Sequence, residues 1–127
     1  MQRCVAVVEE YLRSMVDHDW DALAATLAPD VVRSGPYLDD YRGAPAYVGF
    51  LAETVPALDH YELEVARVWG DGDGRVCAEL SETVTLGGGR LRTDEAIVFD
   101  VDEFDRIVAV QVFLRKSYDP TEVNTDI

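Results

Sequence analysis

The chain has 127 residues, 48% of them hydrophobic, and a formal net charge of −14. This length and composition fit one globular domain with its own core. The negative charge argues against nucleic acid or an anionic membrane as a partner, because both bind clustered Lys and Arg. No run of about 18 apolar residues is present that could span a membrane. The N-terminal stretch lacks the pattern of a signal peptide, so we expect a cytoplasmic protein.

The first half of the chain is predicted to be mainly helical. Apolar residues recur at helical spacing over residues 3–17. A second helix is predicted from Asp19, which can cap it, to residue 27, because Pro29 then stops it. Residues 30–37 follow as a short strand. A third helix is predicted with Pro45 in its first turn.

The second half of the chain has the period-two alternation of β-strands. The predicted strands span residues 61–69, 75–86, 90–101 and 106–115. Helices followed by antiparallel strands predict an α+β fold, with the helices packed on one face of a curved sheet. We expect one domain over residues 1–118 and a C-terminal tail over residues 119–127.

Two of the predicted strands are joined by a triple glycine, and each carries a glutamate. If Gly88 and Gly89 form a two-residue turn, Glu82 lies opposite Glu95. The two carboxylates then share one face of the sheet with apolar residues. A slip of one residue, which a triple glycine permits, would place Glu95 opposite Ser81 and separate the pair.

Opposed carboxylates in an enclosed site would have chemical use. Burial and like charge raise the pKa of one of them, so that one can be an acid while the other is a base. Arg33 shares strand parity with Gly35 and is expected to point inward as well. A salt bridge from Arg33 to a glutamate would keep both carboxylates charged. The alternative to a pocket is a hydrated position of Glu82 and Glu95 at the rim of the sheet.

No metal or other cofactor is expected. His18 and His60 lack the clustered partners of a zinc site. The DGDG stretch at residues 71–74 lacks the further acidic ligands of a calcium loop and predicts a turn. Cys4 and Cys77 lie in apolar patterns typical of buried, free cysteines.

Residues from about 4 to 118 resemble the nuclear transport factor 2-like superfamily. The similarity rests on a tyrosine-bearing first helix, the DWDAL of the second helix, a PDV strand, a GAPA helix start and the closing hairpin DEAIVFDVDEFDRIVAVQVFL. The superfamily includes SnoaL-like polyketide cyclases, ketosteroid isomerases, limonene epoxide hydrolases and scytalone dehydratases. The resemblance implies a cone-shaped α+β barrel, with three N-terminal helices packed in the concave face of a strongly curved, mostly antiparallel sheet. It also implies a pocket in the mouth of the cone and a homodimer.

The resemblance implies Tyr11 as a hydrogen-bond donor in the pocket, since ketosteroid isomerases use a tyrosine on the first helix. Their two acids are absent, because Gly35 and Ile97 stand in those places. The last-strand aspartate of the cyclases and epoxide hydrolases corresponds to Val112. These departures argue against a steroid isomerase, and they weaken the case for a cyclase or an epoxide hydrolase.

The expected function is a cofactor-independent proton transfer on a small apolar organic molecule, of the isomerase, cyclase, dehydratase or hydrolase type. The expected catalytic residues are Glu82, Glu95, Tyr11 and Arg33. The expected pocket residues are Met15, Gly35, Tyr37, Tyr47, Phe50, Leu80, Ile97, Phe99, Val110 and Val112. The alternative is a non-catalytic module of the same fold that binds a ligand or forms a dimer.

Overall fold

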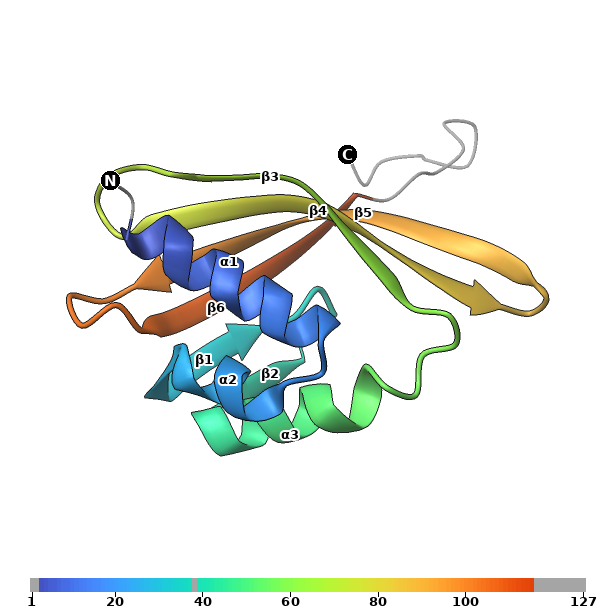
Figure 1. Cartoon of the computed structure of the whole chain (residues 1–127), viewed down its shortest axis with the longest axis horizontal. Coiled ribbons are helices and arrows are strands. Elements are labelled where there is room, and N and C mark those ends of the chain that lie inside the picture. Colours follow the sequence, from blue (N-terminus) through green and yellow to red (C-terminus); the bar gives the residue numbers. More distant parts are fainter. Residues whose placement is uncertain (1–2, 38, 116–127) are drawn as a thin grey trace, which may run out of the picture.

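The computed structural model describes residues 3–37 and 39–115 of the chain, and the predicted tail at 119–127 lies outside these residues. Helices lie against one side of a curved sheet (Figure 1). The elements in chain order are α1 (Arg3–Val16), α2 (Trp20–Ala25), β1 (Leu27–Ser34), β2 (Asp40–Arg42), α3 (Ala44–Thr54), β3 (Glu62–Gly70), β4 (Arg75–Leu86), β5 (Gly89–Val101) and β6 (Ile107–Arg115).

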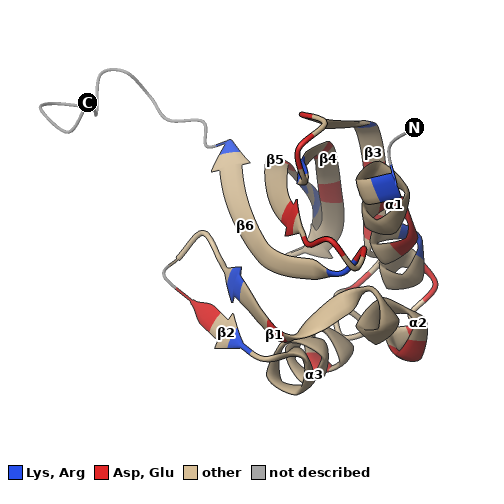
Figure 2. Cartoon of the chain, turned by 90° about the vertical axis from the view of Figure 1, so that its left-hand side faces the viewer, with Lys and Arg blue, Asp and Glu red and all other residues tan. Residues whose placement is uncertain are grey.

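The sheet is mixed and open. Its strand order is β2-β1-β6-β5-β4-β3, in which β1 and β6 run parallel and every other neighbouring pair is antiparallel. The α+β class is therefore confirmed. The closed barrel is not, because β2 and β3 are edges of the sheet in the part of the chain described. Register shifts in three of the pairings are typical of β-bulges, which bend strands, and β6 curves visibly in Figure 2.

The segment after the second helix differs from its prediction. The Asp19 side chain does cap α2, accepting a hydrogen bond from the Ala22 N–H at 3.1 Å. The helix nevertheless ends at Ala25, and Pro29 lies inside β1. The N–H of Ile107 donates to the Thr26 carbonyl at 2.8 Å, which draws the chain into the sheet at this point. Pro29 is tolerated because the pairing of β1 with β6 is irregular there.

The hairpin between β4 and β5 has a different register from the predicted one. Leu86 pairs with Gly89, and the turn consists of Gly87 and Gly88, both with positive φ. Two-residue turns of this kind match the twist of paired strands and favour glycine. Glu82 therefore lies opposite Thr93 and not opposite Glu95.

Glu95 itself pairs with Leu80. The prediction that the two glutamates are directly opposed is wrong by two positions. Because side chains alternate with period two, a shift of two positions leaves both glutamates on one face of the sheet. They are diagonal neighbours, since Glu95 follows Thr93 by two residues on β5.

Candidate functional site

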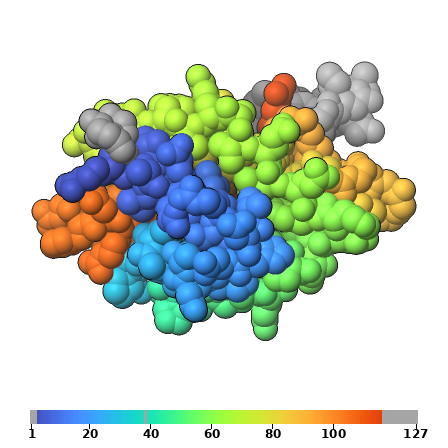
Figure 3. Space-filling model, in the orientation of Figure 1, coloured from blue at the N-terminus to red at the C-terminus, as the bar shows by residue number. Residues whose placement is uncertain are grey.

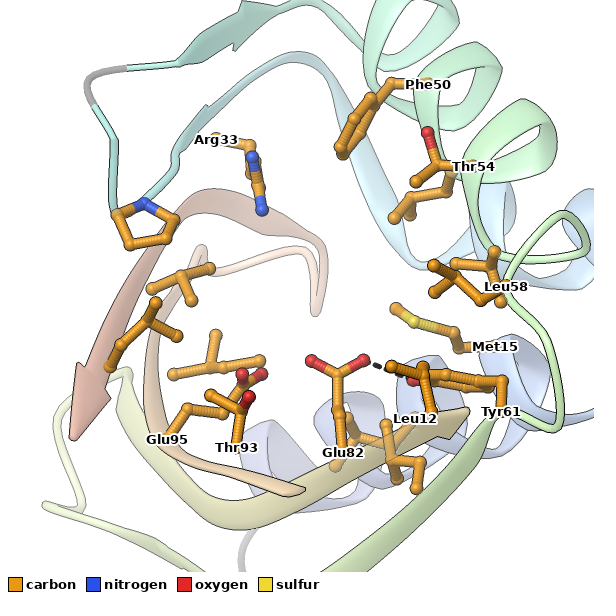
Figure 4. Close-up of a pocket in the computed structure, with 18 of the residues that line it drawn as sticks. Leu12, Met15, Arg33, Phe50, Thr54, Leu58, Tyr61, Glu82, Thr93 and Glu95 are labelled. Carbon is orange, nitrogen blue, oxygen red and sulfur yellow. Dashed lines mark hydrogen bonds between the residues drawn. The ribbon is translucent and has the colours of Figure 1, made fainter. Parts of the chain in front are cut away.

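A cavity of about 290 Å³ lies between the helices and the inner face of the sheet (Figure 4). This volume is near the lower end for pockets that bind small molecules. In the space-filling view, α1 and α2 (blue) cover the middle of this face and the green segment after α3 lies beside them (Figure 3). Most of the wall is apolar. The polar residues that line it are Tyr11, Arg33, Tyr37, Tyr47, Thr54, Tyr61, Glu82, Thr93 and Glu95.

The two carboxyl groups come from neighbouring strands, Glu82 from β4 and Glu95 from β5, and both project into the cavity (Figure 4). Burial raises the pKa of Glu95, and a hydrogen bond with Glu82 and the negative charge of Glu82 raise it further, to about 9. The positive charge of Arg33 opposes this rise only in part. At neutral pH, Glu95 is therefore a protonated acid next to another carboxyl group.

Tyr61 is a site residue that the sequence analysis missed. Its hydroxyl donates a hydrogen bond to Glu82 Oε2 at 2.5 Å. Burial, followed by the charge of Glu82, raises the pKa of Tyr61 above its usual value, so the hydroxyl keeps its proton. Tyr61 lies two residues before Leu63, which pairs with Glu82 across β3 and β4. This period-two relation is the signal that could have placed Tyr61 beside the glutamate.

Tyr11 and Tyr47 meet at the wall of the cavity, where their buried hydroxyl groups hydrogen-bond to each other. Burial raises the pKa of Tyr11 well above its usual value. Burial also raises the pKa of Tyr47, to about 12, although the positive charge of Arg33 lowers it. Both hydroxyl groups are therefore neutral hydrogen-bond donors at physiological pH.

Arg33 pairs with Asp39 rather than with a glutamate, although the sequence had left a salt bridge to Glu82 or Glu95 open. Its Nη1 donates to Asp39 Oδ2 at 2.8 Å. Burial opposes ionisation of Asp39, but hydrogen bonds from the Tyr37 N–H and from Arg33 outweigh it and hold the pKa of Asp39 below its usual value. The N–H of Gly35 donates to the Asp39 carbonyl at 3.0 Å, which folds the loop after β1 back toward Arg33.

Six of the ten predicted pocket residues line the cavity: Met15, Tyr37, Tyr47, Phe50, Ile97 and Val112. Three others belong to the hydrophobic core instead and do not line it: Leu80, Phe99 and Val110. They share the inner face of the sheet but are covered by neighbouring side chains. The Phe99 ring, for example, packs edge-to-face on the Tyr11 ring, with 5.3 Å between the ring centres.

Gly35 is the remaining predicted pocket residue, and it also lies outside the lining. A Cβ atom at this position would stand 2.5 Å from Arg33 Nη1 and would also collide with the Asp39 carboxyl group. The absence of a side chain at residue 35 thus makes room for the Arg33–Asp39 ion pair.

The described part of the chain contains no group of three His, Cys, Asp or Glu residues placed to hold a metal ion. In the same residues, no helix is both long enough and apolar enough to cross a bilayer.

The open, curved sheet, the helices on its inner face and the pocket between them define an α+β protein of the nuclear transport factor 2-like class, and solved structures share this fold. The chain is similar to a provisionally named ketosteroid isomerase of Kribbella flavida, with 25% identity, 94% of this chain and 83% of that one covered, and a TM-score of 0.75. It is also similar to an LEH-like epoxide hydrolase of M. tuberculosis, with 23% identity, coverage of 91% and 84%, and a TM-score of 0.77.

A third similar structure is a hypothetical protein with a ketosteroid isomerase-like fold from Catenulispora acidiphila, in complex with trimethylamine. It has 15% identity, coverage of 84% of this chain and 83% of that one, and a TM-score of 0.73. The sequence profile of the SnoaL-like domain matches residues 8–110, so the chain belongs to the SnoaL-like domain family. No curated protein sequence matches it.

Proposed function

We propose that this protein binds a small organic molecule in the cavity and catalyses a cofactor-independent proton transfer on it. The observation that carries the proposal is the pair of adjacent carboxyl groups, Glu82 and Glu95, in a mostly apolar pocket. Membership of a fold class that includes isomerases, cyclases and epoxide hydrolases supports the same reading. Fold alone does not decide chemistry, so the residues carry the argument.

The two glutamates have different roles in this proposal. Glu82 is the general base, and the hydrogen bond from Tyr61 fixes its carboxylate in the cavity. Glu95 is the general acid, because it holds a proton at neutral pH. Glu82 takes one proton from the substrate and Glu95 gives one back. A proton then passes from Glu82 to Glu95 and restores the starting state, so the cycle consumes no co-reactant. Tyr11, paired with Tyr47, donates to an oxygen that becomes negative.

A general probe of a carboxylate base tests this function without knowledge of the substrate. The ring of 5-nitrobenzisoxazole opens when a base removes one C–H proton. The C–H electron pair completes a nitrile, the N–O bond breaks and a coloured phenolate is released. We expect Glu82→Gln to lower kcat/KM by about 100-fold or more. The matched control is Glu79→Gln, which removes a glutamate on the opposite face of the same strand. Equal rates for the wild type, Glu82→Gln and free acetate would refute the proposal.

The alternative is a non-catalytic module that binds a ligand or associates as a dimer. It is favoured by Gly35, Ile97 and Val112, which stand where the resembling enzymes have acids. A ligand that binds the folded state raises the melting temperature whether or not chemistry follows. Ligand-dependent stabilisation together with an inactive wild type in the ring-opening assay would therefore select this alternative.

A cytoplasmic homodimer completes the proposal. Trp69 and Phe113 are about half exposed, and both lie on the face of the sheet away from the cavity. Exposed aromatic side chains are typical of protein interfaces. Size-exclusion chromatography with light scattering measures the mass of the protein in solution. A Phe113→Asp variant is expected to shift a dimer toward monomer.

A further inference from the structure

The hydrogen bond that fixes Glu82 comes from a segment outside the regular sheet. Tyr61 donates it from the end of the connection between α3 and β3, and β3 begins only at the next residue, Glu62 (Figure 4). Residues 56–60, which lead to Tyr61, are all exposed. Exposed connections with few buried contacts open more easily than the strands beside them. The place of the Tyr61 hydroxyl therefore depends on what holds the backbone of this connection.

The backbone next to Tyr61 has an unusual conformation. His60 has a positive φ of 50°, which residues other than glycine seldom adopt. Such a conformation persists where surrounding contacts impose it. One of these contacts comes from the β4–β5 hairpin, where the N–H of Thr85 donates to the Asp59 carbonyl at 2.8 Å. The strand that carries Glu82 is thus bonded to the connection that carries Tyr61.

Arg90, the second residue of β5, bridges the same two segments and contacts both chain neighbours of Tyr61. Its Nη1 donates to the His60 carbonyl at 2.9 Å, and its Nη2 donates to the Glu62 carboxylate. Nη1 also donates to Thr85 Oγ1 at 2.9 Å, which fixes the guanidinium on its own hairpin. The residues before and after Tyr61 are therefore held by one side chain.

Arg90 acts from outside the cavity, since its side chain does not belong to the lining, whereas that of Tyr61 does. Successive side chains of an extended chain point to opposite faces, so Glu62 points outward where Tyr61 points inward. An exposed ion pair alone contributes little. Three acceptors on two segments, bound by one planar fork of donors, fix a geometry that a single ion pair does not.

We propose that Arg90 is a positioning residue of this site: it binds the residues on both sides of Tyr61 to the β4–β5 hairpin and so keeps the Tyr61 hydroxyl on the Glu82 carboxylate. This inference rests on the proposed function, in which Glu82 is the base, and assigns a role to a residue outside the cavity. Without Arg90 the connection moves away from β4 and the carboxylate rotates. A base that is out of line removes a proton more slowly.

NMR of protein labelled with ¹³C at tyrosine Cζ, the carbon that bears the hydroxyl, tests the positioning directly. The resonance that disappears in Tyr61→Phe belongs to Tyr61. In Arg90→Gln we expect this resonance to move toward the value of free tyrosine in water, because the bond to the carboxylate is lost. The matched control is Arg92→Gln, which removes an arginine on the same face of β5 that pairs with Asp94 at 3.0 Å. It is expected to leave the resonance in place.

Kinetics of 5-nitrobenzisoxazole ring opening test the consequence for the base. Arg90→Gln is expected to lower kcat by about 10-fold and to change KM by less than about twofold, because Arg90 acts on the alignment of the base and does not touch the cavity. In a Tyr61→Phe background, Arg90→Gln is expected to cause no further loss of kcat, since the group through which it acts is already absent.

The inference is overturned by a Tyr61 resonance that stays in place in Arg90→Gln, by an equal shift in Arg92→Gln, or by additive losses of kcat in the double variant. If Arg90→Gln does not fold, Glu62→Gln removes the carboxylate that Arg90 binds. It is expected to move the Tyr61 resonance in the same direction, and an unchanged resonance would overturn the inference as well.

The proposed function and this inference fail separately. Ring opening that depends on Glu82, with an unmoved Tyr61 resonance in Arg90→Gln, removes the positioning role and leaves the proton-transfer function. A moved resonance in a protein whose wild type opens no ring removes the function, and with it the catalytic meaning of the contact between Arg90 and the residues beside Tyr61.

Discussion

Glu79 and Glu95 lie on neighbouring strands but on opposite faces of one sheet, and their pKa values move in opposite directions. On the outer face, hydrogen bonds from Trp69 at 2.7 Å and Arg67 at 2.6 Å lower the pKa of Glu79. On the inner face, burial and the nearby Glu82 raise the pKa of Glu95 to about 9. The alternation of side chains along a strand thus turns one residue type into a surface anion on one face and a buried acid on the other.

The largest expected effect tests whether the inner face carries the stability of the fold. Phe99 is fully buried, whereas Phe113 is 53% exposed on the outer face. We expect Phe99→Ala to lower the free energy of unfolding by about 3–5 kcal/mol, because it leaves a cavity in the core. Phe113→Ala is expected to cost less than about 1 kcal/mol. Urea denaturation of both variants measures the difference, and equal losses would contradict it.

The next effect concerns the buried hydroxyl pair. Tyr11→Phe leaves the Tyr47 hydroxyl buried without its partner, which is expected to cost about 1–3 kcal/mol of stability. The double variant with Tyr47→Phe has no orphaned group. Its loss is therefore expected to be smaller than the sum of the two single losses. Additive losses in this double-mutant cycle would show that the two hydroxyl groups act independently.

The stability contributions of Glu95 and Glu79, on opposite faces of the sheet, are expected to change in opposite directions with pH. Between the usual carboxyl pKa of 4.5 and its raised value of about 9, Glu95 keeps a proton in the folded protein that the unfolded chain releases. Stability from this group is therefore complete below the lower value and is lost as pH rises through the interval, by about 1–2 kcal/mol after allowance for solvent screening. Glu95→Gln is expected to flatten this loss in denaturation curves recorded from about pH 5 to about pH 9.

Glu79 provides the opposite case for the same measurement. Its lowered pKa means that its contribution is present above the usual carboxyl value and is lost on acidification. Glu79→Gln is therefore expected to lower stability by a constant amount at neutral and alkaline pH, and to change the slope of the stability profile only at acid pH. If Glu95→Gln leaves the alkaline slope of the wild type intact, another group causes it.

The smallest expected effect involves two glycines. Gly35→Ala displaces the side-chain ends of Arg33 and Asp39, so we expect less than about 1 kcal/mol of lost stability. Gly49 lies in α3 with open space around its Cα. Gly49→Ala is expected to stabilise the protein by about 0.5–1 kcal/mol. Melting temperatures measure both changes, and a Gly35→Ala variant that gains as much stability as Gly49→Ala would contradict the clash at residue 35.

The sequence could predict which face of the sheet the glutamates occupy, but not their register. Period-two alternation assigns Glu82 and Glu95 to the side of the apolar residues, and any even shift preserves that assignment. The triple glycine, however, allows two different two-residue turns. The structure uses Gly87 and Gly88, and so pairs Glu82 with Thr93.

The sequence also could not predict how deeply each inner-face side chain is buried or how the loop after β1 folds. Leu80 and Ile97 share one face, yet only Ile97 lines the cavity, because covering by neighbouring elements is a tertiary property. The partner of Arg33 depends on the loop after β1, where Asp39 turns back onto the strand. Charge and parity predicted an inward Arg33, but local chain reversal provided a nearer carboxylate than either glutamate.

The parallel pairing of β1 with β6 has a consequence for biosynthesis. Arg33 lies on a strand whose neighbour in the sheet, at Val110, is translated near the end of the described part of the chain. The cavity cannot be completed until β6 has emerged from the ribosome, because Val112 and Leu114 of β6 form part of its lining. The pocket is therefore among the last features of the fold to form during synthesis, after the helices and strands β1 to β5 have been made.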